Sequence, residues 1–198
     1  VYAKRVLRLR PLDPLDQERG AREFGTLVHA AMARLAAGEA PARAAEAALG
    51  EMKLPRALAA FWRPRLHRVA HWAAAEIARR QAEGMVGQWA EIEGIAAFGV
   101  AQVRARADRI EAHPDGLTLV DFKTGAAPSG REVETGRSPQ LVIEALIAEA
   151  GGFAAIPNGE VVRLEYWRAS GGAEPGSVRP VLGPELRAHL AATRPRLE

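Results

Sequence analysis

The sequence predicts an α/β fold in which an N-terminal layer of helices precedes a central mixed β-sheet flanked by further helices. Three observations predict this class. Apolar residues recur at helical spacing over 17–84, strand alternation and turn residues follow over 85–125, and the remaining residues mix helical patterns with a further strand. A chain of 198 residues with 48% hydrophobic content is long enough to bury one substantial core.

The first 16 residues are expected to be a lead-in segment from a longer parent protein. The chain opens at Val1 without Met, and Pro11 and Pro14 would stop any helix begun by the alternating apolar and basic residues before them. We therefore expect a single domain, divided into a helical part at 17–84, a sheet core at 85–169, and a C-terminal loop and helix at 170–198.

Composition excludes several classes of chemistry. The chain contains no cysteine, which excludes disulfides, thiolate catalysis, zinc–thiolate sites and cysteine-ligated iron–sulfur clusters within it. This composition fits a reducing cytoplasm. No apolar run approaches the length needed to cross a bilayer, and no signal-peptide pattern occurs, so we expect no membrane association.

Charge is divided unevenly between the two halves of the chain. Residues 1–80 hold 15 Lys and Arg against 8 Asp and Glu, whereas residues 81–198 hold 12 against 16, so the halves stand at +7 and −4. A basic helical half beside an acidic half suits a ligand with a phosphate backbone and a metal site, respectively. A solvated helix surface explains the basic half equally well.

The first helix is predicted over 17–37 and is followed by Gly38 as its C′ residue. Its apolar stripe follows the helical repeat and consists of Phe24, Leu27, Val28, Ala31, Met32 and Leu35. His29 lies beside this stripe, and Gly25, one turn earlier, leaves an open approach above the imidazole. Taken alone, a histidine in this position is more often a core-edge residue than a ligand.

Two further helices are predicted in the helical part. A short alanine-rich one covers 41–50 and ends at Gly50, and a longer one covers 55–83, where Pro64 indicates a kink or a break. His67 and His71 have the spacing of zinc ligands, but without a third ligand nearby we interpret them as structural or surface residues. The tryptophans are interpreted as core anchors.

The sheet part centres on a predicted hairpin. Strands at 100–110 and 117–122 flank the turn residues of 113–116, and antiparallel pairing would bring Asp108 close to Asp121 and Lys123. Asp121 and Lys123 are two residues apart, so they point to the same face of their strand. Two carboxylates and an ammonium on a mostly apolar hairpin are costly to bury without a purpose, and a divalent metal would use them.

A preceding strand is predicted over 84–99, with Trp89, Glu91, Glu93 and Ile95 on one face. Glu93 either approaches the metal centre or is an edge-strand carboxylate. After the hairpin, Ser138 and Pro139 are expected to be the N-cap and first residue of a helix over 139–150. A strand at 160–169, a loop at 170–180 and a last helix at 183–193 complete the expected order.

Four segments, GTLVHAAM, RADRIE, VDFKTG and SPQLVIEAL, occur in an order and spacing that resemble the RecB-type branch of the PD-(D/E)XK nuclease superfamily. Its pattern is Gly-x-x-x-His on a helix, an Asp-Arg-Ile/Leu-Asp/Glu strand, Asp-Tyr/Phe-Lys-Thr-Gly, and a Gln that opens the next helix. The resemblance covers residues 25–148 and implies a restriction-endonuclease-like core. The lead-in YAKRVLRLRPLDPLD further resembles the entry to the nuclease domains of AddB subunits in alphaproteobacterial AddAB helicase–nucleases.

The resemblance implies a metal-dependent DNA exonuclease that acts in end resection at double-strand breaks. For the AddB type it implies cleavage of the 5′-terminated strand, single-stranded DNA ends as substrate and an AddA-like subunit as partner. Many relatives hold an iron–sulfur cluster through four cysteines; here there are none, so no such cluster is expected. Glu144 also replaces a tyrosine found in many members.

The chemistry of each residue type agrees with roles at such a site. Asp108 and Asp121 are hard oxygen ligands for Mg²⁺, and His29 shifts the preference toward Mn²⁺. The resemblance adds the main-chain carbonyl of Phe122 as a ligand. Lys123 would orient the attacking water and stabilise charge on the phosphate, and Gln140 would hydrogen-bond the water or a phosphate oxygen.

Further residues receive structural or binding roles. Arg109 is expected on the opposite strand face from Asp108, in an ion pair with Glu111. Arg131 and Arg137 are candidates for DNA contacts. Two alternatives stay open: a catalytically inactive DNA-binding module of a helicase–nuclease complex, and a scaffold whose helices dock a partner. The second leaves Asp-x-Lys at the end of an apolar strand without explanation.

Overall fold

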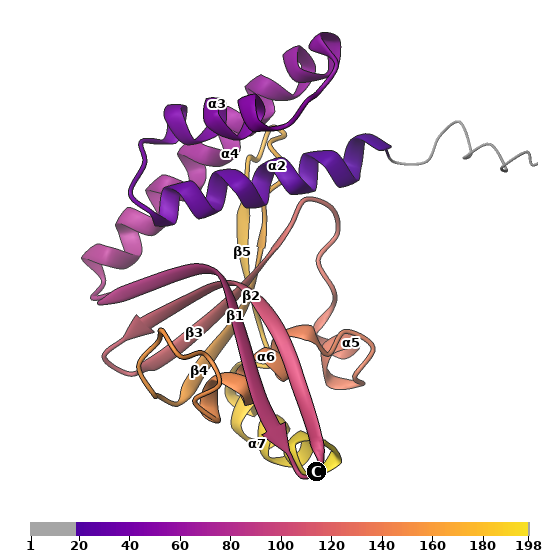
Figure 1. The fold of residues 1–198 in the computed structure, drawn as a ribbon. Coiled ribbons are helices and arrows are strands. Elements are labelled where there is room, and N and C mark those ends of the chain that lie inside the picture. Colours follow the sequence, from indigo (N-terminus) through magenta and orange to yellow (C-terminus); the bar gives the residue numbers. More distant parts are fainter. Residues whose placement is uncertain (1–18, 198) are drawn as a thin grey trace, which may run out of the picture.

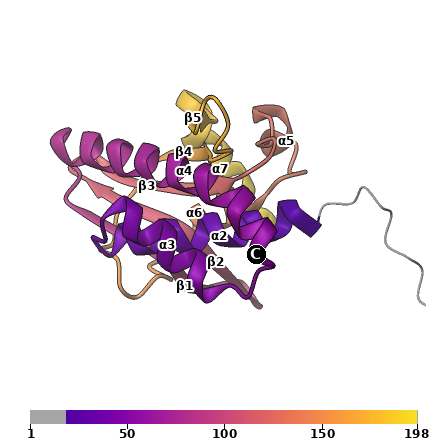
Figure 2. The ribbon, with the colours of Figure 1, turned by 90° about the horizontal axis from the view of Figure 1, so that it is seen from above.

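A computed structural model describes residues 19–197, so the predicted lead-in at 1–16 lies outside the described residues. The three predicted N-terminal helices are present and form a layer that covers one face of the sheet (Figures 1 and 2). They are α2 (Arg19–Ala36), α3 (Pro41–Glu51) and α4 (Arg56–Ala82). None of the helices within residues 19–197 is long and apolar enough to cross a membrane.

The sheet has five strands in the order β1-β2-β3-β4-β5. Only β3 and β4 pair in parallel, and the other neighbours are antiparallel, so the predicted mixed sheet is confirmed. The strands are β1 (Gly87–Phe98), β2 (Ala101–His113), β3 (Gly116–Lys123), β4 (Val161–Arg168) and β5 (Ser177–Val181).

Each face of the sheet has its own apolar core. Val120, Phe122 and Trp167 point to the helical layer, where they pack with the buried stripe predicted on α2. Leu119 and Tyr166 belong to the core on the other face, which is covered by the helices after the hairpin (Figure 1). These are α5 (Gly130–Glu134), α6 (Gln140–Glu149) and α7 (Leu186–Thr193), with the short 3-10 turns Gly183–Glu185 and Arg194–Arg196 around α7.

The predicted end of the second helix is wrong, because α3 continues past Gly50 to Glu51. Of the kink or break predicted at Pro64 in the third helix, the break does not occur, because α4 runs through it as one helix. Trp62 and Leu66, on either side of the proline, are buried, and their packing compensates for the backbone hydrogen bond that proline cannot make.

The region after the hairpin also differs from the prediction. The expected loop at 170–180 contains most of β5, which is an edge strand. Pro180 has no N–H to donate, and an edge strand tolerates this because one of its sides forms no ladder. Helix α5 was not predicted, although Ser129 and Glu132 form a capping box at its start. Ser138 does not cap α6; Pro139 occupies the N-cap, and the Ser138 hydroxyl lies 3.3 Å from the Tyr166 hydroxyl.

The two predicted surface or structural histidines have such roles. His67 Nε2 lies 2.7 Å from Glu46 Oε1, and His71 Nδ1 lies 2.8 Å from the main-chain oxygen of His67. Trp62 and Trp167 are buried anchors of the core between the helical layer and the sheet, as predicted.

Candidate active site

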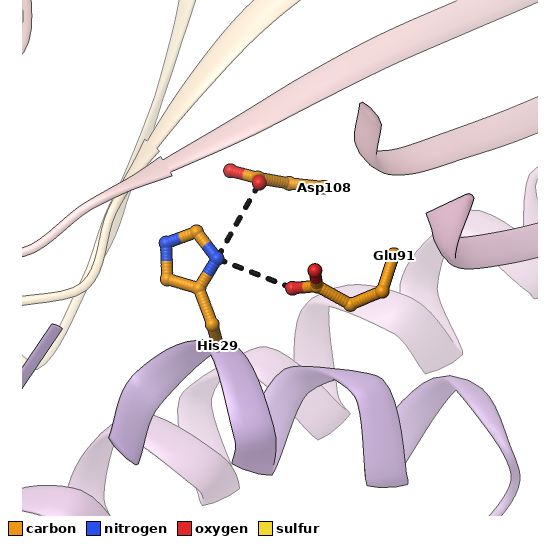
Figure 3. Close-up of side chains that lie close together, drawn as sticks. All are labelled: His29, Glu91 and Asp108. Carbon is orange, nitrogen blue, oxygen red and sulfur yellow. Dashed lines mark hydrogen bonds and ion pairs between the residues drawn. The ribbon is translucent and has the colours of Figure 1, made fainter. Parts of the chain in front are cut away.

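His29 reaches the site from the edge of the buried stripe on α2. The stripe turns Val28 fully inward and leaves the imidazole 34% exposed at the layer boundary. Its Nδ1 lies 3.2 Å from Glu91 Oε1 and 3.4 Å from Asp108 Oδ1. Figure 3 shows that this nitrogen faces both carboxylates. The ring stands edge-on to Phe122, with centroids 5.6 Å apart. Helix α2 therefore places one nitrogen ligand against carboxylates from two strands.

The two carboxylates keep the imidazole protonated in the absence of a metal. Burial opposes the charged form, but hydrogen bonds and charge from Asp108 and then Glu91 outweigh it and raise the pKa of His29 to about 10. At neutral pH an imidazolium therefore bridges Asp108 and Glu91. A cation at Nδ1 would replace that proton.

Asp108 joins β2 to β3 where their ladder ends. The last backbone pairs lie on the turn side, from Arg109 opposite Val120 onward. Asp108 is buried; its Oδ2 accepts the N–H of Phe122 at 2.8 Å, while Oδ1 faces His29. The predicted proximity of Asp108 to the Asp-x-Lys segment is thus present. The main-chain N–H of Phe122 donates this hydrogen bond to Asp108. The main-chain carbonyl of Phe122 stays a predicted metal ligand.

Asp121 and Lys123 lie together at the end of β3, as their spacing predicted. Lys123 Nζ is 2.5 Å from Asp121 Oδ2 and 5.8 Å from the centre of the Tyr166 ring. Asp121 is only 1% exposed, and among the described residues neither of its oxygens accepts a hydrogen bond of regular geometry. Burial is the main cause that raises the pKa of Asp121 to about 6; Asp108 adds to it, and Lys123 and His29 oppose it.

Gln140 and Glu144 face each other one turn apart on α6. Gln140 Nε2 donates to Glu144 Oε1 at 3.1 Å, and Glu144 Oε2 has no hydrogen-bond partner within residues 19–197. Burial raises the pKa of Glu144 to about 8, the Gln140 hydrogen bond opposes this, and the charges of Asp121 and Asp108 add to it. The carboxyl groups of Asp108, Asp121 and Glu144 therefore share one electrostatic environment.

The donor set fits a hard divalent cation. Asp121 offers a buried oxygen, Oδ1, without a partner among the described residues, and such an oxygen is costly to bury unless it coordinates a metal. In the described part of the chain, one group of at least three histidine or acidic ligands has its atoms within 4.8 Å of one another: His29, Glu91 and Asp108. Asp121 is not in this group, although its carboxyl group responds to the charges of His29 and Asp108.

Glu91 is the site residue that sequence reasoning missed. Glu93, the residue considered instead, is exposed and pairs with Arg106 across the ladder. The register itself was readable: the β1–β2 turn at 99–100 places position 91 opposite position 108, between the pairs Ala90–Arg109 and Ile92–Ala107. The direction of the Glu91 side chain could not be predicted, because its φ of +52° has no signature in the sequence.

Arg109 forms the predicted ion pair, with its Nε 2.6 Å from Glu111 Oε1. Arg109 lies over the Trp167 ring, and its register partner Val120 packs toward the helical layer too. Asp108, beyond the end of the β2–β3 ladder, contacts His29 on α2 and its charge also acts on Glu144 on α6. That Arg109 and Asp108 point to opposite faces stays a prediction.

Arg131 and Arg137, the candidates for DNA contacts, are exposed around α5. With Ser129, Glu132 and Thr135 they line a depression of about 330 Å³. Neither arginine has an ion-pair partner in the part of the chain that the structure describes. Their guanidinium groups are thus available to an anion, and DNA binding by them stays a prediction.

Comparisons with known proteins agree with this geometry. A family model described as the PD-(D/E)XK nuclease superfamily matches residues 2–197. A protein of Rickettsia bellii is 27% identical over 168 residues, which cover 77% of this chain and 20% of that protein. A Rickettsia conorii protein is 41% identical over 70 residues, or 35% of this chain and 7% of that protein. Both are named only as uncharacterized proteins, and the chain spans a fifth or less of their length.

Proposed function

The chain belongs to the PD-(D/E)XK nuclease superfamily, and from that premise we propose that it is a Mg²⁺- or Mn²⁺-dependent exonuclease that hydrolyses phosphodiester bonds at single-stranded DNA ends. One observation carries the proposal. Asp121 is buried at the end of β3, where Lys123 pairs with its Oδ2 and its Oδ1 has no partner among the described residues. A purely structural ion pair would not leave a buried carboxylate oxygen unsatisfied at 1% exposure.

Asp121, Asp108 and His29 are the residues that would hold the cation. They offer two carboxylates and one imidazole nitrogen, a set that suits Mg²⁺ and, through the nitrogen, Mn²⁺. When bound, the cation supplies positive charge that stabilises the phosphate oxygens as water attacks. Asp108 also holds the end of β3 in place through the Phe122 N–H.

Lys123 supplies a positive charge beside the carboxylates. Asp121 and the Tyr166 ring face hold its ammonium group from two sides, so the amine is oriented before substrate binds. In this position it orients the attacking water and stabilises the negative charge that grows on the phosphate. The ion pair with Asp121 suits an electrostatic role for Lys123 better than that of a general base.

Gln140 stands at the N-terminus of α6, where unpaired main-chain N–H groups favour an anion. Its amide nitrogen is bound to Glu144, which leaves the amide oxygen free to accept a hydrogen bond from water. Arg131 and Arg137, exposed around α5, would contact DNA phosphates outside the site.

The broader role that we propose is end resection in double-strand break repair, as the AddB-like part of a complex with an AddA-like helicase–nuclease subunit. The support is the likeness of the sequence motifs to that branch of the superfamily. The alternative is an inactive DNA-binding module. It is favoured by one observation: His29 is already satisfied by two carboxylates, as in a structural ion pair.

The deciding experiment measures cleavage of end-labelled single-stranded DNA with Mg²⁺, with Mn²⁺ and with a chelator. The Lys123→Ala protein should keep its fold and its metal binding while cleavage falls about 100-fold or more, the effect of removing one donor to a transition-state oxyanion. Lys53→Ala, which changes an exposed lysine on the helical layer, is the matched control and should cleave like the wild type.

Two outcomes would contradict the proposal. Equal, metal-independent cleavage by wild type and Lys123→Ala would show that the activity comes from elsewhere. A wild type that binds DNA and cleaves with neither metal would establish the inactive module.

A further inference from the structure

Glu91 adopts a backbone conformation that is unusual for its residue type. Its φ is +52°, and among residues 19–197 Leu182 is the other non-glycine residue with positive φ. A glutamate in the left-handed region is strained, and such strain persists only where the surroundings enforce it and clusters at functional sites.

The strained residue redirects the side chains of β1. Trp89 packs into the core beneath α6, so regular alternation would aim position 91 there too. Instead Ile92 packs into that core, and Glu91 turns to the opposite face toward α2. The positive φ is therefore what brings a carboxylate to His29 (Figure 3).

The contacts of Glu91 divide its two oxygens between different partners. Oε1 lies 3.2 Å from His29 Nδ1, whereas Oε2 lies 3.0 Å from Arg106 Nε. The guanidinium of Arg106 is 61% exposed and approaches from the solvent side, while Glu91 itself is 22% exposed. Arg106 thus holds the carboxylate in place through one oxygen and leaves the other directed inward.

A second observation indicates that this cluster receives a cation. Asp121 is 1% exposed, and although Lys123 pairs with its Oδ2, its Oδ1 has no partner among the described residues; its carboxyl group also lies within the electrostatic influence of His29 and Asp108. A buried, unsatisfied carboxylate oxygen near a group of ligand atoms that lie within 4.8 Å of one another is typical of a metal site without its metal.

We propose that Glu91 is a further protein ligand of the divalent cation, beside His29 and Asp108, and that Arg106 positions it. The inference rests on the proposed metal-dependent function and adds to it an oxygen ligand from β1. A third carboxylate makes the site harder and more anionic, which strengthens binding of divalent cations with oxygen preference.

The test measures binding of Mn²⁺ to the metal-free protein, by electron paramagnetic resonance of the free ion and by calorimetry, without any nuclease assay. Glu91→Gln should weaken Mn²⁺ binding by at least about tenfold, the cost already seen when only an outer-shell partner is lost. Glu93→Gln removes an exposed carboxylate two residues away on the same strand and should leave the affinity unchanged. Glu91→Asn is a second variant, because asparagine tolerates the left-handed region.

The results separate this inference from the proposed function. Weaker binding in Glu91→Gln and Glu91→Asn, with Glu93→Gln unchanged and circular dichroism unaltered, supports the ligand role. If Asp108→Asn loses binding while both Glu91 variants keep wild-type affinity, the inference is wrong and the metal-dependent site stands. A wild type that binds no Mn²⁺ would overturn both.

Discussion

Two groups of buried charges lie on different faces of the sheet, one toward the helical layer and one toward α6, and they differ in how fully their charges are paired. In the first, Arg80 on α4 bonds Glu76, Glu111 and Glu165 at 2.6–2.9 Å, and Arg109 bonds the other oxygen of Glu111. Every charge in this structural network has a partner of opposite sign. In the site group, Asp121 and Glu144 keep oxygens that nothing in the described chain satisfies.

The pKa values follow this difference and not the degree of burial. Glu111 is 0% exposed and Asp121 is 1% exposed. Burial favours the neutral form of both, yet Arg109 and Arg80 outweigh it and lower the pKa of Glu111, whereas burial prevails at Asp121 and raises its pKa to about 6. Buried carboxylates whose countercharges do not outweigh burial therefore mark the candidate site, and buried carboxylates held by two arginines mark the connection between the helical layer and the sheet.

Breaking the structural network should have the largest effect on stability. Arg80→Leu removes the ion-pair partner of buried Glu165 and leaves Glu111 with Arg109 as its one remaining guanidinium, and loss of one partner of a buried ion pair costs about 3–5 kcal/mol. We expect the free energy of unfolding in urea to fall by that amount. Arg79→Leu, which changes the exposed neighbour, is the control. A loss below about 1 kcal/mol would show that the network is not a structural connection.

Removing a charge from the site group should instead raise the free energy of unfolding. The folded-state pKa of Glu144, about 8, exceeds its ordinary value of 4.5, so the folded state holds the proton that the unfolded chain releases. Wild-type stability should therefore fall as pH rises from 4.5 to 8, and Glu144→Gln should not show that fall. At pH 8.5 the metal-free variant should be more stable by about 1–3 kcal/mol, the usual cost of leaving a buried polar group without a partner.

The measurement for Glu144→Gln is urea unfolding at pH 5 and pH 8.5 in chelator. The two proteins should differ little at pH 5. A variant that is less stable than wild type at pH 8.5 would mean that the Glu144 carboxylate is satisfied in the folded state, which would remove the contrast between the two groups.

Substitution of His29 should change the free energy of unfolding least, because its imidazole is partly exposed. Its pKa is raised from 6.5 to about 10, so the stability from its ion pairs is fully present below pH 6.5 and is lost as pH rises through 10. Screening by solvent reduces this contribution to about 1 kcal/mol. The difference in unfolding free energy between wild type and His29→Gln, measured without metal, should shrink between pH 6 and pH 10.5. A difference independent of pH would contradict the pairing with Asp108 and Glu91.

Much of the site was predictable, because its parts lie in short stretches with local rules. Two residues of a strand separated by one must share a face, which joined Asp121 to Lys123 before any fold was known. The helical repeat put His29 at the edge of the buried stripe of α2. Glu91 was not predictable in the same way, because its side-chain direction depends on a strained φ that only the packed sheet and α2 enforce.

The errors in the fold have the same origin. Strand β5 is five residues long, contains Pro180 and follows a glycine-rich stretch, so no local signal separates it from a loop; only pairing with β4 makes it a strand. Pro64 is the opposite case. Proline is a strong local signal for a helix break, but α4 continues through it because Trp62 and Leu66 on either side are buried.

By itself the sequence determined the order of the layers, the hairpin and the residue types that meet at its end, because periodicity and turn chemistry act over a few residues at a time. The tertiary structure alone decided which buried charges find partners. Whether both oxygens of a carboxylate meet arginines, as in Glu111, or one oxygen stays without a partner, as in Asp121, depends on side chains that are far apart in the chain, and electrostatic energy depends on their distance in space.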